Sequence, residues 1–144
     1  MAKITILGAG GFGISLAVMA HKYGHDVTVW SAIQNEIEEI KLCHEQKIKL
    51  PGVKIPEGIK LSTDISCING CEFVLLGIPT SFVRNVAKIA APYITPDMIV
   101  INTGKGLETG SNKRMSQVIA EEIPNAPIVV LSGPSHAEEV GRGI

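Results

Sequence analysis

Hydrophobic and polar residues follow two alternating patterns along this 144-residue chain. Short runs rich in Val, Ile and Leu are separated by longer stretches in which apolar residues recur every three or four positions. The short runs predict six strands, at residues 3–7, 26–30, 59–62, 72–78, 98–103 and 128–132. The longer stretches predict helices at residues 12–23, 34–46, 81–91 and 112–122, with a further helix over 135–140.

Strands that are joined by single helices of this length give right-handed crossovers and a parallel sheet. The run EFVLLGI at 72–78 is almost continuously apolar, as expected for a central strand that is buried on both faces. Residues 50–58 (LPGVKIPEG) contain two prolines and two glycines, so we expect an ordered loop there. The pattern predicts an α/β fold with a doubly wound parallel sheet, formed by residues 1–144 as one domain.

Composition and charge narrow the classes of function. The formal net charge is −1 and no block of Lys or Arg occurs, which argues against nucleic acid as a partner. No apolar run approaches the ~20 residues that a membrane-spanning helix needs. The first predicted strand begins at Lys3, which leaves no room for a signal peptide before the fold. We therefore expect a cytoplasmic protein without a membrane span.

The three cysteines, Cys43, Cys67 and Cys71, raise the question of a metal site. Cys67 and Cys71 have a C-x₃-C spacing and His44 follows Cys43, but no second Cys/His pair at a recognised zinc spacing accompanies them. We expect free thiols and no bound metal.

The first predicted strand runs directly into a Gly-x-Gly-x-x-Gly turn, which opens the first helix. In such a turn Gly8 permits the tight bend, Gly10 lets a pyrophosphate approach the bare backbone, and Gly13 lets the helix pack closely on the sheet. The N–H groups and the positive dipole end of that helix favour phosphate. A purely structural glycine turn is the alternative. We interpret the chain as a Rossmann-type dinucleotide-binding domain for NAD or NADP.

Ligands of doubly wound sheets lie at the carboxyl ends of the strands, so the residues after each strand are candidate site residues. After the second strand, Trp30-Ser31-Ala32 offers neither an acid for ribose hydroxyls nor an arginine for a 2′-phosphate. Lys49 could reach the ribose-phosphate region, or it could be a solvated lysine. A charge-assisted hydrogen bond changes affinity about ten- to a hundredfold. With none visible here, we expect discrimination between NAD and NADP below about tenfold.

Three further strand ends carry candidate residues. Pro79 could form a flat apolar wall for the nicotinamide or its ribose, or it could simply end the strand. Lys105 stands between two glycines that leave room around its ammonium, although a solvated loop lysine is the alternative. Gly133 allows a close approach, and Ser135 could bind an anion or only cap a helix. His136 could titrate near neutrality or be a packed histidine.

Five motifs in one order resemble the bacterial-type NAD(P)-dependent glycerol-3-phosphate dehydrogenase family. They are the glycine turn with Phe12, Leu50-Pro51-Gly52, Pro79-Thr80-Ser81, Lys105-Gly106-Leu107-Glu108 and Leu131-Ser132-Gly133-Pro134-Ser135. The resemblance spans nearly the whole chain. It implies reversible hydride transfer between NAD(P)H and dihydroxyacetone phosphate, which supplies sn-glycerol 3-phosphate for phospholipid synthesis.

The resemblance also implies roles for individual residues. Gly11 and Phe12 match contacts to the cofactor pyrophosphate, while Lys105 matches a contact to both cofactor and substrate. Substrate-binding positions correspond to Gly133 and Ser135, and further cofactor positions to Ala32 and Ala137. The chain departs from the family at three of its positions: Ala32 stands where Arg or His is common, Gly11 where Ser is common, and His136 where Phe is common.

The family's general acid/base is a lysine in a mostly helical second domain, which we expect beyond Ile144. We therefore expect no catalytic residue in this chain, weak dinucleotide binding and no measurable turnover by residues 1–144 alone. The chain would be the N-terminal part of a longer enzyme, for which a homodimer is one option. Two alternatives stay open: another two-domain dehydrogenase such as ketopantoate reductase, and a non-catalytic module that senses dinucleotide.

Overall fold

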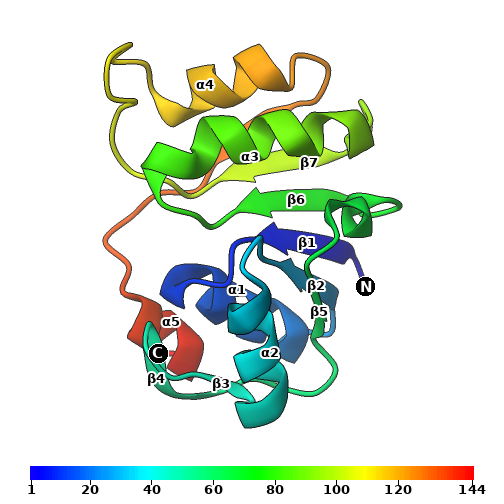
Figure 1. Ribbon diagram of the computed structural model, residues 1–144, viewed down its shortest axis with the longest axis vertical. Coiled ribbons are helices and arrows are strands. Elements are labelled where there is room, and N and C mark those ends of the chain that lie inside the picture. Colours follow the sequence, from blue (N-terminus) through cyan, green and yellow to red (C-terminus); the bar gives the residue numbers. More distant parts are fainter.

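The computed structural model describes residues 1–144 and contains a six-stranded, fully parallel sheet. The strands stand in the order β5-β2-β1-β6-β7-β8, so the chain begins near the middle of the sheet and builds outward in both directions (Figure 1). This is the doubly wound order, and the predicted fold class is confirmed. The strand bounds are β1 Lys3–Leu7, β2 Asp26–Trp30, β5 Lys60–Ser62, β6 Phe73–Leu76, β7 Ile99–Asn102 and β8 Ile128–Val130.

Helices cover both faces of this sheet, and successive strand residues point to opposite layers. Leu7 and Leu76 pack toward α3 and α4, while Ile6 and Leu75 pack toward α1 and α2. The α-helices are α1 Gly11–Lys22, α2 Gln34–Cys43, α3 Val83–Ala90, α4 Met115–Glu122 and α5 Ala137–Arg142. Three 3₁₀-helices complete the connections: η1 Ile65–Ile68, η2 Thr80–Phe82 and η3 Ala91–Tyr93.

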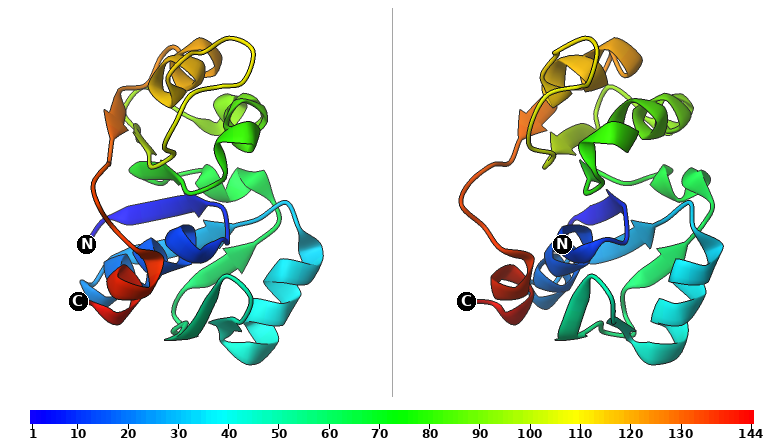
Figure 2. Two further views of the ribbon diagram at one scale, coloured as in Figure 1. Left: turned by 90° about the vertical axis from the view of Figure 1, so that its left-hand side faces the viewer. Right: turned by 60° about the vertical axis from the view of Figure 1, so that its left-hand side comes forward.

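Helix α5 returns to the first helix of the chain. After β8 the chain crosses from the α3/α4 half to the opposite half, where α5 lies beside α1 in both views of Figure 2. The hydroxyl of Ser15 in α1 donates to the carbonyl oxygen of Ala137 at 2.5 Å and can also reach that of Gly11 at 2.8 Å. The beginning of α5 is thereby held against the beginning of α1.

The structure corrects two details of the region after β2. The helix predicted over 34–46 ends at Cys43, because His44 adopts a left-handed conformation with φ of 52°. Residues 50–58 are not only a loop: Leu50–Lys54 forms strand β4, which pairs antiparallel with β3 (Glu45–Gln46). Burial of Leu50 and Val53 against the α1/α2 layer stabilises this hairpin. Pro51 is tolerated because β4 has a partner on one side only.

The helix predicted over 112–122 also begins late, at Met115. Asn112 has a positive φ of 56°, and Leu107 pairs with Arg114 in an isolated bridge. The segment from Lys105 to Arg114 therefore forms a closed loop before α4 begins.

Candidate functional site

One cavity of about 850 Å³ lies at the carboxyl ends of the central strands. Its volume is in the range of sites that hold small molecules and cofactors. The lining residues come from the glycine turn, the end of β2, the loop after β6, the loop after β7 and the beginning of α5. The cavity thus spans the point at which the strand order reverses between β1 and β6, where doubly wound domains bind their ligands.

The glycine turn is close-packed against the loop after β6 and against its own backbone. Gly8 has a φ of +123°, and a Cβ atom there would lie 2.4 Å from the carbonyl oxygen of Gly77. A Cβ atom on Gly13 would lie 2.4 Å from the carbonyl oxygen of Gly8. The geometry predicted for these two glycines is therefore present: one makes the bend and the other lets α1 approach the sheet.

The N-terminus of α1 is open toward the cavity. Gly10 is the N-cap residue and no side chain caps the helix. A Cβ atom on Gly10 would meet only the Lys49 Cδ, at 4.0 Å, and Gly10, Gly11 and Phe12 all line the cavity. Uncapped N–H groups and the positive helix end make this the part of the cavity best suited to phosphate oxygens. A bound pyrophosphate fits these residues.

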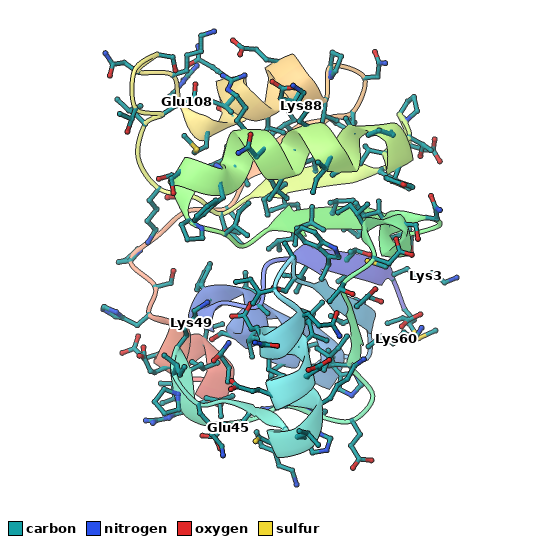
Figure 3. The ribbon with its side chains drawn as sticks, viewed as in Figure 1. Lys3, Glu45, Lys49, Lys60, Lys88 and Glu108 are labelled. Carbon is teal, nitrogen blue, oxygen red and sulfur yellow. The ribbon has the colours of Figure 1, made fainter.

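The structure gives a local reason for glycine at position 11. A Cβ atom there would lie 2.5 Å from the carbonyl oxygen of Lys49 and 3.6 Å from the Cβ of Ala137. The β3–β4 hairpin and the beginning of α5 therefore both approach α1 through this position. Lys49, labelled in Figure 3, lies in the half of the molecule that contains α1, α5 and this hairpin.

An acidic side chain faces the cavity near the end of β2. The sequence prediction missed it because that prediction considered only the residues that directly follow each strand. Ala32 lines the cavity there, and no acid follows the strand directly. Glu36, in the first turn of α2, also lines the cavity and is bound by the Lys49 ammonium at 2.7 Å. Glu36 comes six positions after Trp30 in the sequence, so only the turn into α2 brings its carboxylate to this place.

The opposite half of the cavity is lined by residues predicted from the ends of the other strands. Pro79 and Lys105 line it from the β6 and β7 sides, and Ser135 lines it from the segment before α5. The Lys105 ammonium donates to the carbonyl oxygen of Gly133 at 2.8 Å. Gly133 does not line the cavity itself, and no Cβ contact requires glycine there. Its contribution is the carbonyl oxygen that positions Lys105.

The remaining predicted residues lie around the same cavity. Ala137 and His136 line it beside Ser135, and Phe12 lines it from α1. Gly13 is set back behind the turn, where it packs on Gly8. The structure also adds Thr103, whose hydroxyl donates to the carbonyl oxygen of Leu76 at 2.7 Å and so joins the ends of β6 and β7.

An ion cluster holds Glu108, three residues after Lys105 in the loop that follows β7. Arg84 of α3 holds the Glu108 carboxylate with two nitrogens, at 2.7 and 2.8 Å, and also contacts Glu121 and Glu122 of α4. Hydrogen bonds from Arg84 and then Ser111 lower the pKa of Glu108 to about 2. Figure 3 places Glu108 near α4, in the half of the molecule opposite to Lys49. The loop is thus held at both ends, by this cluster and by Gly133.

The thiols lie outside the cavity and form no disulfide. Cys43 is exposed, whereas Cys67 is half-buried and Cys71 is buried. Burial raises the pKa of Cys67 to about 11, and it also raises the pKa of Cys71. No group of three His, Cys, Asp or Glu side chains comes close enough together to hold a metal ion. No helix has the length and apolar character needed to cross a membrane.

Comparison with known proteins agrees with this geometry. Residues 3–144 match the family model described as NAD-dependent glycerol-3-phosphate dehydrogenase N-terminus. The chain is 42% identical over 147 residues to glycerol-3-phosphate dehydrogenase (NAD(P)+) of Fusobacterium nucleatum, an alignment that covers 100% of this chain and 44% of that protein. It is 45% identical over 142 residues to the enzyme of the same name from Desulfitobacterium hafniense, covering 99% of this chain and 40% of that protein.

A solved structure agrees as well. The crystal structure of glycerol-3-phosphate dehydrogenase from Coxiella burnetii matches with a TM-score of 0.91 and 30% sequence identity, over 99% of this chain and 44% of that one. The chain therefore spans less than half the length of these relatives.

Proposed function

Because the chain belongs to the NAD-dependent glycerol-3-phosphate dehydrogenase family, as its N-terminal domain, we propose that its cavity binds NAD or NADP for interconversion of dihydroxyacetone phosphate and sn-glycerol 3-phosphate. The observation that carries the proposal is a single cavity with two chemically different ends. One end is the open N-terminus of α1, and the other contains Lys105 and Ser135. A dinucleotide and a small phosphorylated ketone need such a pair of adjoining sites.

The proposed cofactor site runs along the carboxyl edge of the sheet. The N–H groups of Gly10, Gly11 and Phe12 bind the pyrophosphate, and Gly8 and Gly13 hold that turn in place. The adenosine end lies beside Ala32 and Lys49, and the nicotinamide end lies beside Pro79, with Lys105 and Ala137 as further contacts. When bound, the cofactor supplies or accepts the hydride.

The proposed substrate site uses the residues that border the nicotinamide end. Lys105 places a positive charge next to the ketone and phosphate oxygens, where charge develops as the carbonyl becomes an alkoxide. Gly133 holds the Lys105 ammonium, and Ser135 offers its hydroxyl to the phosphate group. In this proposal the proton comes from a lysine outside residues 1–144, so the chain alone does not turn over substrate. We also expect the chain alone to bind the cofactor weakly.

Trp30 provides the assay for this proposal. It is the only tryptophan and it lines the cavity, so NADH bound there quenches its emission by energy transfer. We expect saturable quenching that dihydroxyacetone phosphate strengthens, and we expect Lys105→Met to remove that strengthening while NADH still binds. Ketopantoate in place of dihydroxyacetone phosphate is the matched control ligand. Equal strengthening by both ketones would contradict the substrate assignment, and absent quenching would contradict the cofactor site.

Three broader expectations accompany this function. We propose a cytoplasmic location, which the three unpaired cysteines support because reducing compartments keep thiols free. A role in phospholipid synthesis follows from the product, sn-glycerol 3-phosphate. A homodimer is supported by the exposed apolar side chains of Val129, Val130 and Leu131 at the edge of the sheet. Light scattering at two protein concentrations tests the dimer.

A further inference from the structure

Glu36 is the best-fixed charged group at the adenosine end of the cavity. Its Oε2 accepts a hydrogen bond from the Ser31 hydroxyl at 2.7 Å, and its Oε1 accepts from Gln46 at 3.0 Å and from Lys49 at 2.7 Å. Ser31 and Gln46 are buried, and the Glu36 side chain is only 12% exposed. The carboxylate therefore has one position and cannot turn away from a ligand without breaking several bonds.

This network is continuous with the glycine turn. The same Gln46 nitrogen that contacts Glu36 also donates to the carbonyl oxygen of Ala9 at 2.9 Å. Glu36 is thus tied through Gln46 to the turn that would bind the pyrophosphate. In dinucleotide-binding domains the adenosine ribose lies next to the pyrophosphate, at the end of the second strand. Glu36 lines the cavity at that place.

Lys49 cannot by itself make this end favourable to a phosphate group. It is the only Lys or Arg side chain that lines the adenosine end, since the other lining lysine, Lys105, comes from the loop after β7. Its ammonium already neutralises Glu36, and its side chain is 49% exposed. A 2′-phosphate would have to take Lys49 away from Glu36 and would then stand beside an unpaired carboxylate. A ribose hydroxyl, in contrast, can donate to that carboxylate and leave the pair intact.

Resting on the proposed function, we infer that Glu36 is a specificity-determining residue that makes this domain prefer NAD(H) over NADP(H). A hydrogen bond from a hydroxyl to a carboxylate, together with repulsion of a phosphate, is worth more than about tenfold in affinity. The names of the relatives, which read NAD(P)+, leave this choice open. The residues directly after β2 gave a different expectation, of less than about tenfold, because Glu36 enters the site from α2.

Parallel titrations with NADH and NADPH, followed by Trp30 emission, test the inference. The unmodified chain should bind NADH more than about tenfold tighter than NADPH. Glu36→Gln keeps the shape of the side chain and removes its charge, so it should raise the affinity for NADPH and bring the two affinities within a fewfold of each other. Lys49→Met should weaken the binding of NADPH more than the binding of NADH. Glu39→Gln is the matched control, because Glu39 lies on the exposed side of the same helix. The ratio of NADH affinity to NADPH affinity should not change in this variant.

The outcomes separate the inference from the proposed function. If the unmodified chain binds both cofactors with similar affinity, or if Glu36→Gln leaves a strong NADH preference unchanged, the inference is wrong and the cofactor site stands. If neither cofactor binds, the proposed function itself is wrong. The ratio measured on the unmodified chain tests the inference without any variant, so it does not depend on the folding of Glu36→Gln.

Discussion

Replacing Gly13 by alanine separates close packing of the glycine turn from ligand binding by it. The added Cβ atom would lie 2.4 Å from the carbonyl oxygen of Gly8, 3.3 Å from its carbon and 3.4 Å from the carbonyl oxygen of Gly77. Real Cβ contacts essentially never fall below 3.0 Å, and all three neighbours are backbone atoms that cannot rotate away. Helix α1 must therefore move off the sheet.

The size of the effect follows from two opposing terms. Forcing an extra methyl group into a packed interior costs about 1–3 kcal/mol, and the 2.4 Å clash with a backbone oxygen places Gly13 in the upper part of that range, at about 2–3 kcal/mol. Alanine in place of glycine within a helix returns about 1 kcal/mol. We expect a net loss of about 1–2 kcal/mol in the free energy of unfolding, which lowers the Tm of a domain of this size by roughly 3–10 °C.

Gly10→Ala is the matched control for this experiment. Its φ of −73° suits alanine, and the new Cβ would meet only the Lys49 Cδ, at 4.0 Å. Thermal unfolding should therefore change little, whereas NADH affinity should fall by about tenfold or more, because the methyl group occupies the space needed by the pyrophosphate. Thermal melts and NADH titrations of both variants give the answer. An unchanged or higher Tm for Gly13→Ala, or equal losses of Tm in both variants, would refute the packing argument.

Three further outcomes follow from the ion cluster, the thiols and the hairpin. The pKa of Glu108 is lowered from 4.5 to about 2, so its stabilising effect is complete above its unfolded pKa and is lost as the pH falls from 4.5 toward 2. Urea unfolding at about pH 6 and about pH 3 should show a stability advantage over Glu108→Gln that shrinks at the lower pH, and an advantage that grows would contradict this sign. A thiol reagent at neutral pH should modify exposed Cys43 first, because burial keeps Cys67 and Cys71 protonated, and mass spectrometry of the labelled peptides identifies the order. Gly11→Ser should displace Lys49, whose carbonyl oxygen would lie 2.5 Å from the new Cβ, and weaken NADH binding, whereas affinity equal to that of the unmodified chain would show that the hairpin yields easily.

The order of strands and helices was predictable because most strands are short apolar runs between helical stretches. The run at 72–78 and the glycine turn at Gly8–Gly13 defined the centre of the sheet, and the structure places β6 next to β1 there. The hairpin of β3 and β4 was not predictable from periodicity. Pro51 and Gly52 read as loop residues, and only the burial of Leu50 and Val53 against α1 and α2 makes the segment a strand.

The candidate site was also predictable only in part. Residues in the loops after the strands, such as Pro79, Lys105 and Ser135, were predicted together because the fold brings all strand ends to one edge, and the structure places them around one cavity. Glu36 was missed because it reaches the site from a helix, through contacts with Ser31, Gln46 and Lys49 that are set by tertiary packing. Gly133 was predicted from its motif as a substrate contact, but the contact that the structure shows is its backbone carbonyl with Lys105, which a sequence does not reveal.

The central claim is that a dinucleotide lies with its pyrophosphate on the N-terminus of α1. Backbone amide NMR spectra of the 144-residue chain, recorded with increasing NADH, test this claim most directly because they locate even weak binding. The largest shifts should fall on the amides of Gly10 to Gly13, with a second set at Ser31 to Ile33 and smaller changes near Lys105. Shifts confined to residues away from this cavity, or no shifts at saturating NADH, would contradict the account.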